Sequence, residues 1–574
     1  MTRTRRTFLS IIAVAMIGTG TMIGAKFGGI APQWSDPITD ITGNKVVELT
    51  IASSVTKQRW LEASVKAFSD ADIRTSTGSL ISIKVQNVLS GDSMEKILAG
   101  KSLPVVWSPG ESSWVSQFDA QWSLHHNKPA MAGPCKPTIY APSGIAVWRP
   151  MAEALGWPNK PVAWKTLIDL AAEPQGWSKY GHPEWGKLKL GYTHPQYSSA
   201  GMLFLTSMVY GISGKASGLT PDQVYSKPVE AGFLAMAQNT SKYGMSTTAL
   251  LDMMARQGPD YLHAISAFEE GVVRFNLERG SELRFPLVFI SPTEGTFWSD
   301  HPYCILDKAD WVSPEQKEAA TLFLNFLLAK EQQLLATDYF LRPLDSKIGS
   351  GTKLTLANGT DPSLRPESQH QFEIPNAATT SAVIDQFLAT KRKAKVMLVL
   401  DVSGSMIGEP IRAATVATAG FLKRLDPHDK VGLMIFNEHV TTVSDIQPAS
   451  IVSEELSRRV LQLVAGGGTN LNGAICQAVA KMKADASSPE DRLDGIVVLS
   501  DGADTEGEVS ENRMFQTCLP ASAEANGIKI FSIAFGDSAN LDALSHISKA
   551  TGGTMFTADA STVDQAYLKI SAEQ

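Results

Sequence analysis

The last third of the chain opens with a continuous apolar run, Val396-Met397-Leu398-Val399-Leu400, followed at once by Asp401-Val402-Ser403-Gly404-Ser405-Met406. Five consecutive apolar residues that end in a polar loop are typical of a strand buried on both faces of a parallel sheet. In such sheets ligands bind beyond the carboxyl ends of the strands. The loop that begins at Asp401 is therefore a candidate site.

The residues after this loop continue the alternation of strands and helices. The patterning predicts strands over 431–436, 495–500 and 528–535, and helices over 454–464, 471–483, 513–526 and 541–551. Regular alternation of this kind predicts an α/β fold with a doubly wound parallel sheet.

Two more polar segments are expected at the same edge of this sheet. Thr469 follows three glycines and precedes a predicted helix, and Asp501 follows the strand over 495–500. Together with Asp401, Ser403 and Ser405 they supply two carboxylates and three hydroxyls, without imidazole or thiolate. Ligands that are all oxygen suit a hard divalent cation, with Mg²⁺ the first choice and Ca²⁺ or Mn²⁺ as alternatives.

This pattern resembles the metal-ion-dependent adhesion site (MIDAS) of von Willebrand factor type A (VWA) domains, and the resemblance covers residues 391–574. It implies a Rossmann-like domain in which Ser403, Ser405 and Thr469 bind the metal directly, while Asp401 and Asp501 act through water. The open coordination position would take a carboxylate from a partner protein. The alternative is a domain that keeps the fold and binds no metal. Just past the motif, Asp504 and Glu506 are expected to be solvated loop charges.

Length and composition indicate more than one domain. A chain of 574 residues suggests two to four domains. With 58 acidic against 51 basic side chains, a net charge of −7 argues against nucleic acid as the main partner. All 12 tryptophans lie between Trp34 and Trp311, which favours two separate units. Residues 346–390 are predicted to be a linker, rich in turn-forming residues, with a lead-in helix near 382–388.

The part before the linker is predicted to form two α/β lobes over residues 45–345. Strands are expected at 46–52, 81–85 and 104–109, and the segments 139–147 and 286–291 are expected to cross to a second, more helical lobe. Two lobes joined by crossings enclose a cleft for a small ligand. The predicted ligand-binding residues are Ser53, Ser54, Trp107, Ser108, Ser198 and Ser199. The last two precede a helix, whose N-terminus favours an anion or carboxylate, although simple helix capping is the alternative.

This part resembles extracellular solute-binding proteins of the type II periplasmic class. The residues that carry the resemblance are Pro104-Val105-Val106-Trp107-Ser108-Pro109, Ala154-Leu155-Gly156-Trp157-Pro158, 181–186 and 296–303. The order of the two parts is similar to that in bacterial substrate-binding and VWA domain-containing proteins. The expected fold is thus a periplasmic-binding-protein-like domain followed by a Rossmann-like VWA domain.

Residues 1–31 are predicted to direct export. Arg3, Arg5 and Arg6 precede 18 residues without a charge, from Phe8 to Ala25. This is a signal peptide or an N-terminal membrane anchor, and Thr4-Arg5-Arg6-Thr7-Phe8-Leu9 resembles a twin-arginine signal. The rest of the chain is then periplasmic or extracellular. In that compartment Cys135 and Cys304 are able to pair, whereas Cys476 and Cys518 are expected to be buried in helices.

The sequence therefore favours an exported, non-enzymatic binding protein of the adhesion type. Its MIDAS metal would bind an acidic residue of a partner protein, and its cleft would take a small, anionic ligand. The alternative is the solute-binding component of an ABC-type importer, in which the VWA domain docks a membrane permease. An enzyme is the third and least favoured hypothesis, because we find no catalytic motif.

Overall fold

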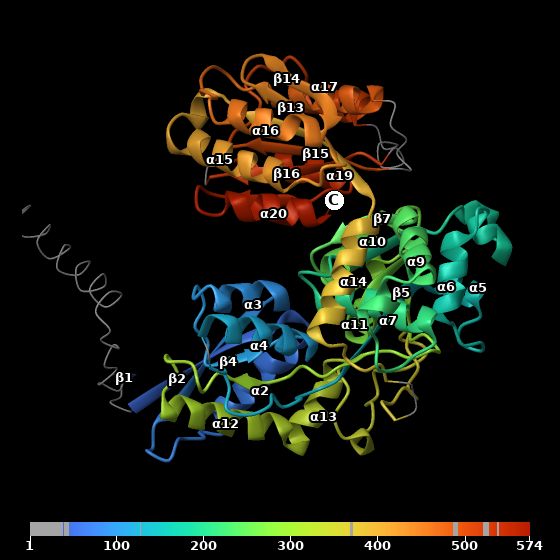
Figure 1. The fold of residues 1–574 in the computed structure, drawn as a ribbon, viewed down its shortest axis with the longest axis vertical. Coiled ribbons are helices and arrows are strands. Elements are labelled where there is room, and N and C mark those ends of the chain that lie inside the picture. The colour runs from blue at the N-terminus through green and yellow to red at the C-terminus, as the bar shows by residue number, and fades with distance from the viewer. Residues whose placement is uncertain are drawn as a thin grey trace, which may run out of the picture.

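The computed structural model describes residues 38–39, 45–126, 128–367, 371–485, 492–519, 527–536 and 539–573. The predicted export segment, residues 1–31, lies outside these ranges. Within them no helix is long and apolar enough to cross a membrane. The described chain forms three sheets, one in each of two lobes and one in the C-terminal domain (Figure 1).

The first lobe is built around one long strand, β2 (Lys45–Ser54). Strands β3 (Leu80–Val88) and β4 (Val106–Ser108) pair with it in parallel, and β1 (Ile38–Thr39) pairs antiparallel. The apolar residues of β2 face a core shared with Trp60 and Phe68 of the next helix. The helices of this lobe and its flank are α2 (Gln58–Asp70), α3 (Ser90–Leu98), α4 (Ser113–His126), α12 (Pro314–Leu328) and α13 (Lys330–Asp338).

The second lobe holds a mixed sheet in the order β10-β5-β8-β6-β7, with β9 on the other edge of β5. The strands are β5 (Ala141–Trp148), β6 (Leu190–Thr193), β7 (Thr240–Gly244), β8 (Ala264–Phe268), β9 (Leu287–Ile290) and β10 (Trp298–Ser299). Its helices are α5 (Arg149–Leu155), α6 (Trp164–Ala172), α7 (Ser199–Ser213), α8 (Pro221–Val224), α9 (Lys227–Gln238), α10 (Thr247–Gln257) and α11 (Glu269–Arg279).

One expected crossing between the lobes is wrong. The segment 286–291 is not a connection: it forms β9, which pairs antiparallel with β5 inside the second lobe. The chain returns to the first lobe later, between β10 and β11 (Cys304–Ile305), which pairs with β4. A four-residue apolar run looks the same in a crossing and in a buried strand, because periodicity records burial and not direction.

The C-terminal sheet has the order β14-β13-β12-β15-β16-β17 and is parallel except at β14. Its strands are β12 (Lys393–Asp401), β13 (Lys430–Phe436), β14 (Val440–Pro448), β15 (Arg492–Ser500), β16 (Lys529–Phe535) and β17 (Met555–Ala558). One face packs α15 (Glu409–Arg424), α16 (Ala449–Val460) and α20 (Val563–Glu573), and the other packs α17 (Leu471–Ala484) and α19 (Leu541–Ala550). The α/β class and the doubly wound arrangement are confirmed.

Two details of this domain differ from the prediction. The helix expected over 513–526 is a short helix, α18 (Glu511–Arg513), continued by a wide turn over Met514–Cys518, and 520–526 lie outside the described residues. Cys476 and Cys518 are joined in a disulfide, which the sequence did not predict. Outside this domain, the pairing that the sequence allowed between Cys135 and Cys304 is present. Buried cysteines in helices and disulfide partners look alike in a sequence, because pairing depends on distance in space.

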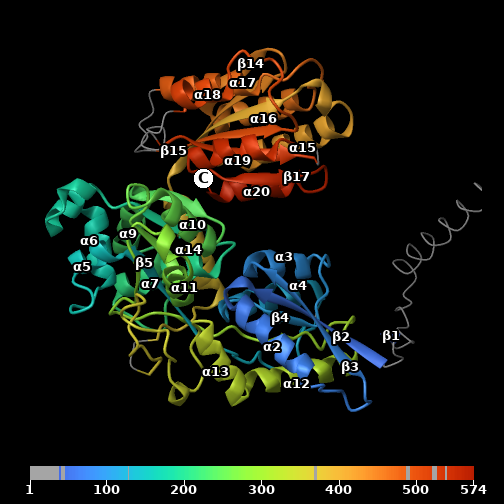
Figure 2. The same cartoon turned by 180° about the vertical axis from the view of Figure 1, so that it is seen from behind.

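Between the lobes and the C-terminal domain, the chain packs against the second lobe. Leu354, Leu364 and Phe372 are buried there although they belong to no long helix or strand. Helix α14 (Ala377–Thr390) then lies against α7, α8 and α9 and also contacts α4 of the first lobe. Viewed from either side, the C-terminal domain lies above the second lobe, with α20 on its lower surface (Figures 1 and 2).

Candidate functional sites

Two carboxylates and two hydroxyls meet at the carboxyl end of the C-terminal sheet. Asp401 is the last residue of β12, and Asp501 directly follows β15, the neighbouring strand. The Ser405 hydroxyl donates to Asp501 Oδ1 at 2.6 Å, and the Oγ atoms of Ser403 and Ser405 are 3.1 Å apart. Residues from the ends of two adjacent parallel strands thus form one cluster.

Asp401 is held at both of its oxygens. The backbone N–H of Ser403 donates to Oδ1 at 2.8 Å, and the hydroxyl of Ser500 donates to Oδ2 at 2.6 Å. Burial raises the pKa of the Asp401 carboxyl, and the negative charge of Asp501 raises it further, while the bonds from Ser403 and Ser500 oppose this. Two carboxylates that repel each other in a buried position favour a cation between them.

Thr469 lies on the loop that runs beside this cluster. The backbone N–H of Gly404 donates to the carbonyl of Gly467 at 2.9 Å, which ties the loop to the serines. Gly467 has φ +91°, and a Cβ there would lie 1.7 Å from Glu438 Oε2. Only glycine tolerates both the positive φ and the close approach of Glu438, so the loop needs a glycine at position 467 to adopt this conformation. The backbone N–H of Thr469 is bonded to Thr505 Oγ1 at 2.9 Å.

The cluster fits a small hard cation. In an octahedral Mg²⁺ site, ligands at 2.0–2.1 Å and at right angles lie about 2.8–3.0 Å apart. The two serine oxygens are hydrogen-bonded at 3.1 Å, slightly farther apart than that. In the described ranges, no three side chains of the types His, Cys, Asp and Glu gather as a metal group. The present cluster is of another kind, because it contains only two side chains of those types, Asp401 and Asp501, and serine hydroxyls supply its other oxygens.

Several residues around the cluster were not predicted. In the sequence, Ser500 is only the residue before Asp501. Its hydrogen bond to Asp401 could not be predicted, because it depends on the register between β12 and β15. Asp504 is more than a solvated charge, since its Oδ2 accepts from Asn472 N at 2.9 Å at the start of α17. Glu438 Oε2 accepts from Gly468 N at 2.9 Å.

The second candidate site is a cavity of about 320 Å³ between the two lobes. Hydroxyl side chains from both lobes dominate its polar lining, and the first residues of α3, α7 and α10 reach it. The polar lining residues are Ser54, Thr56, Gln58, Arg59, Ser90, Tyr197, Ser198, Ser199, Ser246, Thr247, Thr248, Glu270 and Arg274. Helix N-termini present unpaired N–H groups and a partial positive charge, so their convergence favours an anionic ligand.

The cavity includes half of the residues predicted to bind ligand. Ser54, Ser198 and Ser199 line it. Ser198 makes no side-chain capping bond to α7, so capping is not what its hydroxyl does in this structure. The hydroxyl of Ser199 accepts from Trp114 Nε1 at 2.8 Å and lies 3.4 Å from Ser90 Oγ, across the boundary between the lobes.

The other three predicted residues are not among those that line the cavity. Trp107 is buried and donates to Ser93 Oγ at 2.9 Å, and Ser108 donates to the carbonyl of Pro302 at 2.7 Å. Ser53 is buried, with its hydroxyl 3.4 Å from the carbonyl of Ser54. Neighbouring residues of a strand point to opposite faces. This alternation explains why Ser54 lines the cavity and Ser53, beside it on β2, does not.

The charged groups in the cavity are paired. Arg59 of the first lobe bonds Glu278 of the second at 2.5 Å, and Arg274 bonds Glu270 at 2.8 Å. Burial raises the pKa of Glu270, and Arg274 opposes the rise. Lys57 and Glu111, whose pKa values burial shifts to about 7 each, are not among the lining residues.

The two-lobed fold with an interlobe cavity, followed by a doubly wound domain with an oxygen-rich cluster, defines a binding protein of two parts. A family model described as "Bacterial extracellular solute-binding protein" matches residues 49–342, just over half of the chain. A second, "von Willebrand factor type A domain", matches residues 395–568. The chain belongs to the bacterial extracellular solute-binding proteins and carries a C-terminal VWA domain.

Curated relatives match in the VWA part. Inter-alpha-trypsin inhibitor heavy chain H4 of Bos taurus is 33% identical over 151 residues, which are 25% of this chain and 16% of the relative. Uncharacterized protein sll0103 of Synechocystis is 28% identical over 192 residues, 33% of this chain and 42% of the relative. The chain thus spans less than half the length of either relative.

Solved structures resemble each part separately. The von Willebrand factor type A protein from Catenulispora acidiphila is 21% identical, with TM-score 0.28, over 32% of this chain and 43% of that one. The sulfate-binding protein SubI from Mycobacterium tuberculosis is 15% identical, with TM-score 0.37, over 53% of this chain and 88% of that one. At these scores, neither likeness carries a functional argument.

Proposed function

We propose that this protein is an exported, non-enzymatic binding protein whose VWA domain binds an acidic residue of a partner protein through a divalent metal. The observation that carries the proposal is the convergence of Asp401, Ser403, Ser405 and Asp501 at one end of the sheet. Ser403, Ser405 and Thr469 would hold the metal, and Asp401 and Asp501 would orient its water ligands. The metal, Mg²⁺ in the first instance, supplies an open position that attracts a carboxylate.

The metal site is tested by calorimetric titration of the metal-free protein with Mg²⁺, Mn²⁺ and Ca²⁺. We expect one site in the unaltered protein and none in Asp401→Ala. The matched control is Asp445→Ala, which removes an exposed carboxylate of the same domain that pairs with Lys481. Equal binding by Asp401→Ala and the control would refute the site.

The partner is tested by capture from membrane extract with Mg²⁺, with EDTA, and with Asp401→Ala. We expect the partner to be retained only by the unaltered protein with Mg²⁺. A protein captured equally in all three arms would contradict metal-bridged recognition.

We further propose that the interlobe cavity binds a small anionic solute. The support is the hydroxyl-rich lining and the three helix N-termini at Ser90, Ser199 and Thr247. Thermal-shift titration with sulfate, phosphate and small carboxylates tests it. We expect Ser199→Ala to weaken binding about ten- to hundred-fold, because a hydrogen bond to a charged group is worth about 1.5–3 kcal/mol.

The control for this experiment is Ser69→Ala, an exposed serine on α2 that bonds only its own helix. Equal solute affinities for the two variants would show that the Ser199 hydroxyl does not bind the solute. The second candidate function, a solute-binding component of an importer, is favoured by the same cavity. Transport predicts tight solute binding that EDTA leaves unchanged, together with capture of a permease.

A further inference from the structure

Two buried hydroxyls in the interlobe cavity are left for a ligand. Ser54 and Ser198 line the cavity and are only 6% and 8% exposed. Neither side-chain oxygen makes a hydrogen bond within the described part of the chain, although buried hydroxyls are normally bonded. Ser54 lies next to Ser199, because a Cβ on Gly110 would meet Ser199 Oγ at 2.6 Å and Ser54 Oγ at 3.4 Å. With Ser90, whose Oγ is 3.4 Å from that of Ser199, these three serines form what we call the serine cluster.

A guanidinium with free N–H groups lines the same cavity. Arg274 of α11 uses its Nε, which donates to Glu270 Oε1 at 2.8 Å. Its two terminal nitrogens make no hydrogen bond to any residue that the structure describes. Glu270 lies one helical turn before Arg274 and therefore orients the guanidinium. Among the described residues, no hydrogen bond joins this pair to the serine cluster.

The charged residues of the lining leave an excess of positive charge. They are Arg59, Arg274 and Glu270, whereas Glu278, the partner of Arg59, is not among the lining residues. Arginine binds carboxylate and phosphate groups through two parallel N–H bonds. The free side of Arg274 is therefore suited to an acidic group of the solute.

The rest of the lining is apolar. It consists mainly of Val55, Val88, Leu89, Leu251 and Phe268. The cavity volume of about 320 Å³ lies within the range of ~300–1,000 Å³ that is typical of pockets for organic ligands. An inorganic oxyanion has no apolar surface to place against these side chains, so the cavity favours a solute with a carbon chain.

We propose that the solute is an organic acid with two anionic groups, and that Arg274 is the residue that recognises the second group. The serine cluster and the N-termini of α3 and α7 hold the first group, the apolar wall contacts the carbon chain, and the terminal nitrogens of Arg274 hold the second group. This assignment rests on the anion site proposed above, and it names a dicarboxylic or phosphorylated acid as the class of solute. Glu270 is a positioning residue for Arg274.

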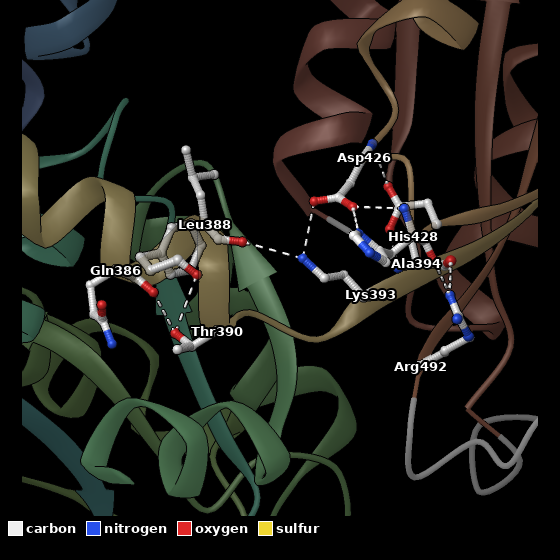
Figure 3. Close-up of polar contacts among 10 residues, drawn as sticks. Gln386, Leu388, Thr390, Lys393, Ala394, Asp426, His428 and Arg492 are labelled. Atoms are coloured by element: carbon white, nitrogen blue, oxygen red, sulfur yellow. Dashed lines mark hydrogen bonds and ion pairs between the residues drawn. The ribbon is translucent and has the colours of Figure 1, made fainter. Parts of the chain in front are cut away.

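Solute binding is measured on the full chain, because the second lobe is tied to the VWA domain. Only two residues separate α14 from β12. Within this joint Lys393 Nζ bonds back to the carbonyl of Leu388 at 3.3 Å and forward to Asp426 at 3.0 Å (Figure 3). Lys242 of the second lobe also pairs with Glu573 of α20 at 2.6 Å in a buried position, so removing the VWA domain would leave this lysine without its partner.

Calorimetric titration with dicarboxylates, from malonate to adipate, tests the second anionic group. The reference solutes are sulfate and the monocarboxylates of the same chain lengths, from propionate to hexanoate. We expect the best dicarboxylate to bind the unaltered protein at least about ten-fold more tightly than its monocarboxylate, because it gains a charged hydrogen-bonded pair. Arg274→Gln should remove this preference and leave monocarboxylate binding unchanged, whereas Ser199→Ala should weaken the binding of both.

Arg274→Lys is the second variant, in case loss of the charge beside the buried Glu270 unfolds the protein. It keeps a cation next to Glu270 and loses only the planar pair of N–H donors. We expect it to weaken dicarboxylate binding by about ten-fold. The control is Arg256→Gln, which changes an exposed arginine of α10 outside the cavity lining and should leave every affinity unchanged.

Equal affinities of the unaltered protein for dicarboxylates and their monocarboxylates would overturn the proposal. A dicarboxylate preference that survives in Arg274→Lys and Arg274→Gln would also overturn it. Binding of sulfate or monocarboxylates that depends on Ser199 and gains nothing from a second carboxylate rejects only the solute with two groups. If none of these anions binds the unaltered protein, the proposed anion site is itself rejected, and the solute with two groups is rejected with it.

Discussion

Ser500 is the main residue that the structure adds to the predicted metal site. It lies on β15 and donates to Asp401 on β12, so it fixes one oxygen of the carboxylate that the motif names first. Residues of this kind orient metal ligands without touching the metal, and their loss typically costs 10–100-fold in metal affinity.

We therefore expect Ser500→Ala to weaken Mg²⁺ binding by about 10- to 100-fold while leaving the fold intact. Calorimetric titration measures the effect, with Ser444→Ala as control, since Ser444 is a half-buried serine of the same domain whose hydroxyl bonds the carbonyl of the adjacent Asp445. Identical affinities for both variants would show that Ser500 does not position Asp401.

His263 makes the protein sensitive to acid. Burial, with a smaller effect from Lys189, lowers the pKa of this ring to about 3 from an ordinary value of 6.5. Trp177 Nε1 at 3.0 Å and the backbone N–H of Lys189 at 3.1 Å both donate to its Nδ1, which must therefore stay unprotonated. The folded pKa lies below the unfolded one, so the stabilisation is complete above pH 6.5 and is lost as the pH falls toward 3.

We expect His263→Gln to flatten this dependence by about 1.4 kcal/mol per pH unit below 6.5, because glutamine accepts a hydrogen bond and does not titrate. Urea unfolding between pH 4 and 7 measures the slope. The control His546→Gln changes an exposed histidine of the VWA domain. Parallel slopes for the two variants would exclude His263 as the source.

Among the secondary-structure elements, α17 and the turn after α18 are joined by the Cys476–Cys518 disulfide, which the sequence did not reveal. Both partners lie in the VWA domain, and Asn470 and Asn472 at the start of α17 bond Glu508 and the carbonyl of Val509. The disulfide thus holds the loop after Asp501 against the helix that follows Thr469.

We expect Cys476→Ser with Cys518→Ser to lower the free energy of unfolding by about 2–4 kcal/mol, because the bridge restricts the unfolded chain. Urea unfolding with and without reductant measures it. Reductant should destabilise the unaltered protein more than the double variant. The same loss under reductant in both proteins would assign the effect to the other disulfide.

Considered as a whole, the molecule depends on a buried ion pair between its parts. Replacing Glu573 with glutamine leaves Lys242 buried without its partner, next to Lys529, whose pKa burial and the neighbouring cations hold well below its ordinary value. Removing one member of a buried pair costs about 3–5 kcal/mol.

We expect Glu573→Gln to separate a shared thermal transition of the second lobe and VWA domain into two, as recorded by scanning calorimetry. The control is Asp445→Asn, which breaks an exposed pair with Lys481 and should cost less than about 1 kcal/mol. A single transition in Glu573→Gln, shifted no more than in the control, would contradict the fixed interface.

The pattern of the sequence was sufficient for the α/β class and the convergence of polar residues around Asp401, and the resemblance of its motifs to two families indicated the two kinds of domain. These features are local: an apolar run reports a buried strand, and parallel strands bring their carboxyl ends to one edge, whatever lies between them. Only the tertiary structure showed which serines reach the cavity, that Ser500 supports Asp401, and that Lys242 meets Glu573. Those contacts join residues from distant parts of the chain, and their partners depend on register, side-chain direction and domain packing, none of which leaves a periodic mark in the sequence.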